Sequence, residues 1–106
     1  MPMKDIEPEG LDGILSDEGR PVAVDFYTDW CGPCKLLEPR LAQLARDYEG
    51  RARVVSMDAE KASGLVQELG IQCVPTVVFF KDGDECDRIT GLVPYDELAE
   101  SMNELL

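Results

Sequence analysis

Residues 22–35 read VAVDFYTDWCGPCK, and this stretch decides the fold that we expect for the whole chain. Its first half, Val22–Tyr27, is a nearly continuous apolar run, which predicts a central strand covered on both faces. Its second half places two cysteines, Cys31 and Cys34, where this strand passes into a helix. The helix is predicted because apolar residues return every three or four positions, at Leu37, Leu41, Leu44 and Tyr48.

The spacing of Cys31 and Cys34 has direct chemical content. Residues i and i+3 lie on one face of a helix with Cβ atoms about 5–6 Å apart, which is near the distance needed for a disulfide. The first turn of a helix also offers unpaired N–H groups and partial positive charge. Both favour the thiolate, which is the nucleophile in disulfide exchange. We therefore expect this pair to open and close a disulfide with little movement of the backbone.

The rest of the chain alternates strand and helix patterns in the order βαβαβαββα, in a single domain of residues 1–106. This order predicts an α/β fold with a mixed central sheet and helices on both faces. The Asp82-Gly83 pair predicts a hairpin that adds antiparallel edges to otherwise parallel strands. The predicted strands are Met3–Glu7, Val22–Tyr27, Arg53–Met57, Thr76–Phe80 and Glu85–Thr90; the helices carry Leu11–Leu15 (ended by Gly19–Pro21), Cys31–Tyr48, Ala62–Leu69 and the segment from Pro94.

Charge and composition exclude several classes of function. The chain has 106 residues, a net charge of −12, four cysteines and no histidine. An acidic surface repels nucleic acid and acidic membranes, so we expect neither as a partner, and a histidine-based triad or metal site is impossible. Residues Met1–Asp5 lack the blocks of a signal peptide, which predicts a cytoplasmic protein. Disulfides there are usually transient and catalytic, so the cysteines indicate redox chemistry or metal binding.

Five short motifs together resemble the thioredoxin family closely, and the resemblance covers essentially the whole chain. A C-x-x-C pair alone would not be specific, but the combination is. The resemblance implies the thioredoxin fold. The motifs are Val24-Asp25-Phe26, Trp30-Cys31-Gly32-Pro33-Cys34-Lys35, Val74-Pro75-Thr76, Lys81-Asp82-Gly83 and Gly91 before the last helix.

The resemblance also implies a reaction. Cys31, the more exposed thiol, attacks a disulfide in a substrate protein and forms a mixed disulfide. Cys34 then attacks Cys31 and releases the reduced substrate, and a thioredoxin reductase resets the oxidised pair. No bound cofactor is expected, because the Cys31/Cys34 pair itself carries the electrons as a dithiol and becomes a disulfide when it gives them up.

Asp25 is the third residue that we expect in the catalytic machinery. Its neighbours are apolar on both sides, which favours a buried carboxyl group over one that points to solvent from an edge strand. In thioredoxins the matching aspartate assists proton transfer at the second cysteine. Family members often carry a lysine near it, and by alignment that position is Val54 here. Without this charge partner, we expect burial to raise the pKa of Asp25 strongly.

The resemblance assigns the substrate-binding surface to residues around the cysteine pair. Pro75 matches a cis-proline that faces the cysteines, although a trans proline opening a strand is also permitted. The backbone of Val74 would pair with an extended segment of substrate. Trp30 is expected on the rim rather than in the core, and with the Gly91–Leu92 loop it would complete a shallow apolar platform. The predicted substrate-binding residues are Trp30, Gly32, Pro33, Val74, Pro75 and Gly91.

The two remaining cysteines are less constrained by the sequence. Cys73 lies two residues before Pro75 and should be near the active face, and some thioredoxins carry a cysteine there. A monomer that forms a Cys73-linked dimer on oxidation is therefore expected, although simple packing is equally compatible with the sequence. For Cys86 we favour a buried packing role.

Three other functions fit parts of the sequence. A zinc site needs a second close pair of ligands, but Cys73 and Cys86 are far apart in the sequence. A thioredoxin fold used only as a binding scaffold is allowed, since fold does not fix function, but the intact cysteine pair argues against it. An oxidant or isomerase of the same fold is disfavoured because Gly32-Pro33 resembles the reducing members.

Overall fold

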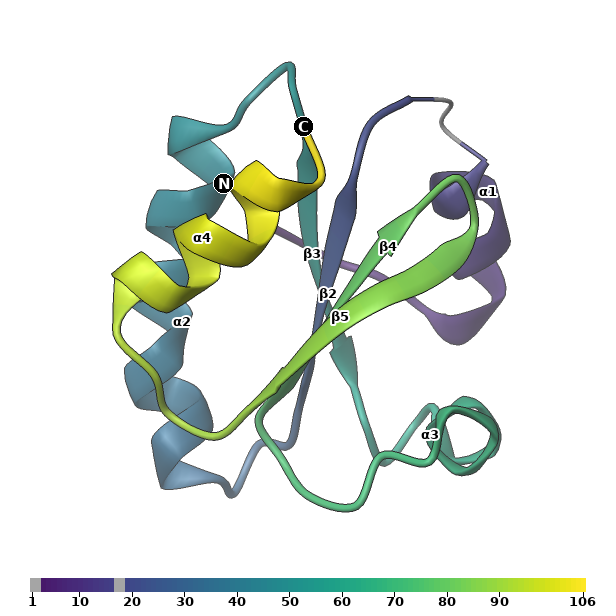
Figure 1. Cartoon of the computed structure of the whole chain (residues 1–106). Helices are drawn as coiled ribbons and strands as arrows, with labels where there is room; N and C mark the ends of the chain where they lie inside the picture. Colours follow the sequence, from purple (N-terminus) through teal and green to yellow (C-terminus); the bar gives the residue numbers. More distant parts are fainter. Residues whose placement is uncertain (1–2, 17–18) are drawn as a thin grey trace.

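The computed structural model describes residues 3–16 and 19–106. Residues 1–2 and 17–18 lie outside the described residues. Met1 and Pro2 belong to the segment Met1–Asp5, from which the cytoplasmic location was predicted. The described residues form five strands and four α-helices with one short 3₁₀ helix, in the predicted order (Figure 1). They are β1 (Lys4–Asp5), the 3₁₀ helix η1 (Pro8–Gly10), α1 (Leu11–Leu15), β2 (Val22–Tyr27), α2 (Gly32–Asp47), β3 (Arg53–Asp58), α3 (Ser63–Leu69), β4 (Thr76–Lys81), β5 (Asp84–Thr90) and α4 (Tyr95–Glu104).

The strands form one mixed sheet in the order β1-β3-β2-β4-β5. Strands β1, β3 and β2 are mutually parallel. Strand β4 runs antiparallel to β2, and β5 runs antiparallel to β4. The expectation that the hairpin only adds antiparallel edges is wrong for β4, which lies inside the sheet beside β2. The α3 connection therefore joins β3 to an antiparallel strand, a topology that the alternation of strand and helix patterns does not reveal.

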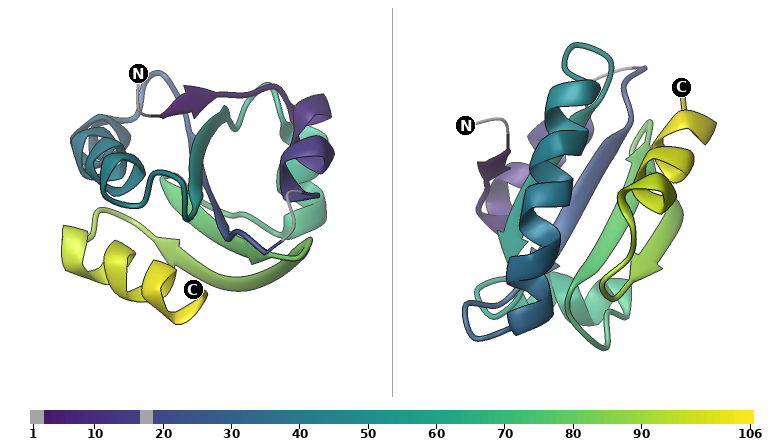
Figure 2. Two further views of the ribbon diagram at one scale, coloured as in Figure 1. Left: turned by 90° about the horizontal axis from the view of Figure 1, so that it is seen from above. Right: turned by 90° about the vertical axis from the view of Figure 1, so that its left-hand side faces the viewer.

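Helices cover both faces of the sheet, as predicted. Helices α2 and α4 lie on one face, and α1 and α3 lie on the other (Figures 1 and 2). Each face has its own hydrophobic cluster, because side chains along a strand point alternately to the two faces. Along β2, Ala23 faces α2 and α4, whereas Val22, Val24 and Phe26 face α1 and α3. Strand β2 is thus the centre of both clusters, in agreement with its continuous apolar sequence.

The ends of several elements follow local backbone chemistry. Gly70 ends α3 in the left-handed conformation, with φ of 71°, as favoured at helix C-termini. Asp82 and Gly83 have φ of 54° and 86° and form the two-residue turn between β4 and β5 that the sequence predicts. Helix α1, in contrast, ends at Leu15 with Ser16 as its cap, earlier than the expected stop at Gly19–Pro21.

Among the described residues, none of the helices combines the length and the apolar character needed to cross a membrane.

Candidate active site

Cys31 and Cys34 form a disulfide at the start of α2, directly after the carboxyl end of β2. Their Cα atoms are 5.3 Å apart. Cys31 is the N-cap residue of α2, and the backbone N–H of Cys34 donates a hydrogen bond to Cys31 Sγ at 3.2 Å. Pro33 lies in the first turn, where its missing N–H costs nothing. The helix start therefore holds the two sulfurs at bonding distance and directs an N–H group at the Cys31 sulfur.

The two cysteines border different cavities, although both are largely buried (6% exposed for Cys31 and 4% for Cys34). We call the cavity beside Cys31 the Cys31 groove. It has a volume of about 610 Å³ and no charged residue among the described residues that line it. The groove is lined by Thr28, Trp30, Cys31, Gly32, Pro33, Ala59, Val66, Ile71, Gln72, Cys73 and Val74.

The segment before β4 closes one side of this groove. The Val74–Pro75 peptide bond is cis, as predicted. Cys31 Sγ lies 3.8 Å from the carbonyl oxygen of Val74, and the N–H of Gly91 donates to the carbonyl oxygen of Pro75 at 2.8 Å. The motifs around residues 31, 75 and 91 are far apart in the sequence, and the sheet brings them together at one end.

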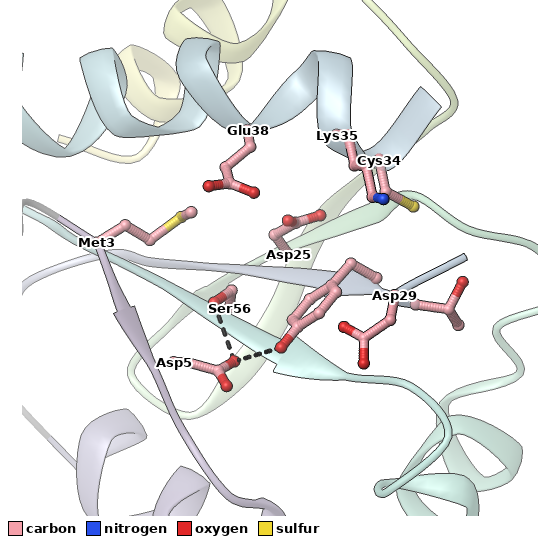
Figure 3. A pocket seen from close by; sticks show the side chains of 10 residues that line it. Met3, Asp5, Asp25, Asp29, Cys34, Lys35, Glu38 and Ser56 are labelled. Atoms are coloured by element: carbon pink, nitrogen blue, oxygen red, sulfur yellow. Dashed lines mark hydrogen bonds between the residues drawn. The ribbon is translucent and has the colours of Figure 1, made fainter. Parts of the chain in front are cut away.

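A second cavity, which we call the acidic cavity, lies on the Cys34 side. It has a volume of about 310 Å³ and contains four carboxyl groups and one lysine among its described lining residues. In Figure 3 the carboxyl group of Asp25 lies between Glu38 of α2 and the pair formed by Asp5 and Ser56. The cavity is lined by Met3, Asp5, Asp25, Tyr27, Thr28, Asp29, Cys34, Lys35, Glu38 and Ser56.

Asp25 is the buried carboxyl group of the acidic cavity. It is 3% exposed, and its Oδ1 has no hydrogen-bond partner among the described residues. The pKa of Asp25 is raised from 3.8 to about 7, mainly by burial and further by the negative charges of Glu38 and Asp5. Desolvation and like charges both disfavour the carboxylate, so Asp25 can accept or donate a proton near neutral pH.

Comparison with known proteins identifies the family. The sequence model of the family described as Thioredoxin matches residues 3–104. The chain belongs to the thioredoxin family. It is 35% identical to the chloroplastic thioredoxin M-type of Spinacia oleracea over 98% of the chain, and it spans only 58% of the length of that relative. It is 39% identical to a thioredoxin of Staphylococcus aureus over 78% of the chain and 80% of the relative.

Solved structures of thioredoxins share the fold of this thioredoxin-family chain. A mutant thioredoxin from Halobacterium salinarum has a TM-score of 0.88 and 34% identity, and the match covers 97% of this chain and 89% of that one. Thioredoxin F from spinach chloroplast (long form) has a TM-score of 0.90 and 30% identity, with 97% and 85% covered. Cys31 and Cys34 are therefore the redox-active pair of a disulfide oxidoreductase, and they act by dithiol–disulfide exchange.

Four of the six predicted substrate-binding residues line the Cys31 groove, whereas Pro75 and Gly91 are not among its described lining residues. Trp30 is 71% exposed and lines the Cys31 groove, so it lies on the rim and not in the core. Asp25 is buried, as predicted. Val54 is also buried and pairs with Ala23, whereas Ser56 is opposite Asp25 in the sheet. Strand β3 thus presents no charge to Asp25 from either of these positions.

The prediction for Cys86 is wrong. Cys86 is exposed on the edge strand β5, at an irregularity where Phe79 pairs with Asp87 and Phe80 pairs with Glu85. This bulge leaves Cys86 without a partner in the ladder, so it does not pack in the core. Cys73 is also a free, exposed cysteine, and it lines the same groove as Cys31.

Three carboxyl groups of the acidic cavity escaped the sequence analysis, namely Asp5, Asp29 and Glu38. Glu38 lies four positions after Cys34, which places both residues on the same face of α2. That spacing was a usable signal. Asp5 carried no such signal, because it comes close only through the pairing of β1 with β3.

Metal ligation has no support in the described part of the chain. No group of three or more histidine, cysteine, aspartate or glutamate side chains there is arranged to hold a metal ion.

Proposed function

We propose that this protein reduces disulfide bonds in other proteins, with electrons supplied by a partner reductase. The observation that carries this proposal is the two-sided setting of the Cys31–Cys34 pair. Cys31 borders an uncharged groove of about 610 Å³, which suits a segment of a protein substrate. Cys34 borders the acidic cavity that contains Asp25, which suits the movement of a proton. The Cys31 sulfur therefore meets the substrate, and the Cys34 sulfur resolves the mixed disulfide from the other side.

The reaction proceeds in two exchanges. The Cys31 thiolate attacks one sulfur of the substrate disulfide, forms a mixed disulfide and releases the first substrate thiolate. The thiol of Cys34 loses its proton, and its thiolate attacks Cys31 to close the Cys31–Cys34 disulfide and release the second substrate thiolate. Two electrons pass from the protein dithiol to the substrate. A thioredoxin reductase then returns two electrons to the pair, and no prosthetic cofactor takes part.

Substrate binds across the Cys31 groove. The backbone of Val74 pairs with an extended substrate segment next to Cys31, as a strand added to the protein surface. This role is supported by the 3.8 Å separation of Cys31 Sγ and the Val74 carbonyl oxygen. Apolar contacts come from the exposed Trp30 on one rim. The remaining substrate-binding residues are Gly32, Pro33, Pro75 and Gly91.

Asp25 is the proton acceptor for Cys34. Both residues line the acidic cavity, and burial raises the pKa of Asp25 to about 7. When the pKa of a base lies near the working pH, about half of its molecules are deprotonated and can accept a proton, and the base is still strong enough to take it.

The proposed setting of the protein is the cytoplasm, where it acts as a monomer without nucleic-acid or membrane partners. The net charge of −12 supports the exclusion of nucleic acid. Under oxidising conditions two copies join through Cys73, which is exposed beside the groove.

A trapping experiment tests the proposed function. Replacing Cys34→Ser leaves Cys31 able to attack but removes the resolving thiol, so mixed disulfides accumulate. We expect this variant to capture disulfide-containing proteins from a lysate, and we expect the wild type to reduce insulin in the presence of dithiothreitol. The Cys31→Ser variant is the matched control and should capture none. Trapping that persists in Cys31→Ser would assign the reactivity to another cysteine, and a wild type without insulin turnover would leave only a scaffold role.

A further inference from the structure

The acidic cavity contains three carboxyl groups besides that of Asp25. Asp25 lies on its sheet side, and Glu38 projects from α2 one turn beyond Cys34 (Figure 3). Asp5 lies on the far side, where it accepts hydrogen bonds from the hydroxyl groups of Tyr27 at 3.0 Å and Ser56 at 3.1 Å. Glu38 and Asp5 are both exposed, so the two carboxylates stand where the cavity meets solvent.

The buried end of the cavity has an unmet polar group. Asp25 is 3% exposed, and its Oδ1 accepts no hydrogen bond from any described residue. A buried oxygen of this kind normally has a partner, which is often water. A cavity of about 310 Å³ with four carboxyl groups in its described lining has room for several water molecules. Water in this cavity can therefore connect Asp25 with the exposed carboxylates at the mouth.

Glu38 differs from Asp5 in how it is held. Asp5 is engaged by two hydroxyl groups, so its replacement would also disturb the packing of β1. Glu38 makes no side-chain hydrogen bond or ion pair with the rest of the described chain. Its effect on Asp25 is therefore electrostatic, through its negative charge, and it can be changed without loss of a structural contact.

We propose that Glu38, at the mouth of the acidic cavity, is a positioning residue that sets the pH at which Asp25 takes up and releases its proton in the Cys34 step. This inference rests on the proposed function, and it assigns to Glu38 a role that acts through Asp25 and not on the sulfurs. The negative charge of Glu38 raises the pKa of Asp25, whereas a positive charge at the same position would lower it.

The Cys34 step moves one proton and one electron pair in each turnover. The Asp25 carboxylate accepts the proton of the Cys34 thiol. The resulting thiolate attacks Cys31 in the mixed disulfide, a new Cys31–Cys34 bond forms, and the bond from Cys31 to the substrate sulfur breaks with its electron pair on the substrate. The protonated Asp25 then passes its proton to water in the cavity, and the proton leaves past Glu38 to bulk solvent.

Several other ionisable groups face Asp25, and one of them, Asp5, raises its pKa in the same direction as Glu38. From β1 there is Asp5, and from β2 there is Tyr27, whose pKa is raised by burial and by its hydrogen bond to Asp5. Asp29 follows β2, and α2 contributes Lys35 and Cys34 as well as Glu38. Ser56 of β3 and Val77 of β4, the cross-strand neighbours of Asp25, do not ionise. Lys35 is the one cation among the described lining residues, and its exposed position leaves it largely screened by solvent.

A charge series at position 38 tests the proposal. We would compare wild type with Glu38→Gln and Glu38→Lys, and follow the Asp25 carboxyl carbon by NMR across about pH 4–10 in oxidised protein. The titration midpoint of Asp25 should fall by at least about 0.5 pH unit in Glu38→Gln, roughly a threefold loss of proton affinity, and further in Glu38→Lys. The acid limb of kcat/KM for insulin reduction should move to lower pH by the same amount.

Two controls isolate the position of the charge. Glu38→Asp keeps the carboxylate and should restore the wild-type midpoint. Glu68→Gln makes the same change of net charge on α3, which lies on the other face of the sheet (Figure 1), and should leave the midpoint unchanged. Equal midpoints in wild type, Glu38→Gln and Glu38→Lys would overturn the proposal, as would an equal shift in Glu68→Gln. The NMR titration needs no turnover, so its outcome is separate from a failure of the proposed function, which absent insulin reduction at neutral pH would reveal.

Discussion

The Cys31 groove and the acidic cavity border the two sulfurs of the same disulfide, yet they have almost no described lining residues in common. The groove has no charged residue in that lining and is about twice as large, whereas the acidic cavity has four carboxyl groups. Among the described residues, Thr28 alone borders both. A substrate segment needs apolar surface and free backbone groups, and a proton needs a polar path. The difference teaches that one turn of helix, from Cys31 to Cys34, is enough to separate these two requirements.

The largest effect is expected from a change in the acidic cavity, Asp25→Asn, and it concerns the free energy of unfolding of the protein. The pKa of Asp25 rises from 3.8 in the unfolded chain to about 7 in the folded one, so the folded state binds this proton more tightly. The stability that this proton contributes is fully present below pH 3.8 and is lost as the pH rises through about 7, with a total cost of about 4 kcal/mol. Urea unfolding of oxidised Asp25→Asn should therefore show an advantage over wild type that grows by this amount between about pH 3 and pH 9.

Comparing the free energies of unfolding at the two pH values separates the effect of removing the ionisable group from the effect of placing an amide in its site. A buried asparagine amide has its own cost, but that cost is the same at both pH values. Asp29→Asn, at an exposed position of the same cavity, should change by less than about 0.5 kcal/mol over this range. An advantage of Asp25→Asn that is equal at low and high pH would mean that folding does not raise the pKa of this carboxyl group.

A smaller effect is expected on the groove side, in substrate affinity. Trp30→Ala removes the most exposed large apolar side chain on the groove rim, and we expect KM for insulin to rise about tenfold, as for an aromatic anchor in an interface. The rate with a small disulfide such as oxidised glutathione should stay within about twofold. Leu36→Ala is the matched control, because Leu36 is exposed but is not among the residues that line the groove. A Trp30→Ala variant that slows both substrates equally would place its role in the sulfur chemistry.

The smallest effect on turnover is expected from the two free cysteines. Cys73→Ser should abolish the disulfide-linked dimer that forms with diamide, while insulin turnover stays within about twofold of wild type. Cys86→Ser should keep the dimer, because Cys86 lies among Asp84, Glu85 and Asp87 on β5, where two copies repel each other. Non-reducing gels would measure both outcomes. A dimer lost in Cys86→Ser and kept in Cys73→Ser would reverse the assignment.

Local signals were enough to predict most of the fold. The apolar run at Val22–Tyr27, the turn at Asp82-Gly83 and the helix that ends at Leu69 each depend on neighbours in the sequence, and the structure agrees with all three. The interior place of β4 was not predictable in this way. Strand order depends on which faces pack together, and the alternation of strand and helix patterns does not determine it.

The errors and omissions at the site have the same origin. Cys86 looked like a packing residue because small apolar residues usually are, but a bulge on an edge strand leaves it exposed to solvent. Asp5 looked like any acid near a chain end, until pairing of β1 with β3 placed it at the mouth of the cavity. Glu38 could have been found from its spacing to Cys34, since helix geometry alone puts both on one face.

The sequence by itself determined the reaction class, because a cysteine pair at a helix start has its geometry and its favourable helix dipole built in by short-range structure. It also determined that Asp25 would be buried, since the residues around it are apolar. Only the tertiary structure decided what surrounds the two sulfurs: an uncharged groove beside Cys31, and three further carboxyl groups beside Asp25. The reason is physical. The charge and shape of a cavity depend on side chains from separate strands and helices, and these meet only when the sheet is assembled.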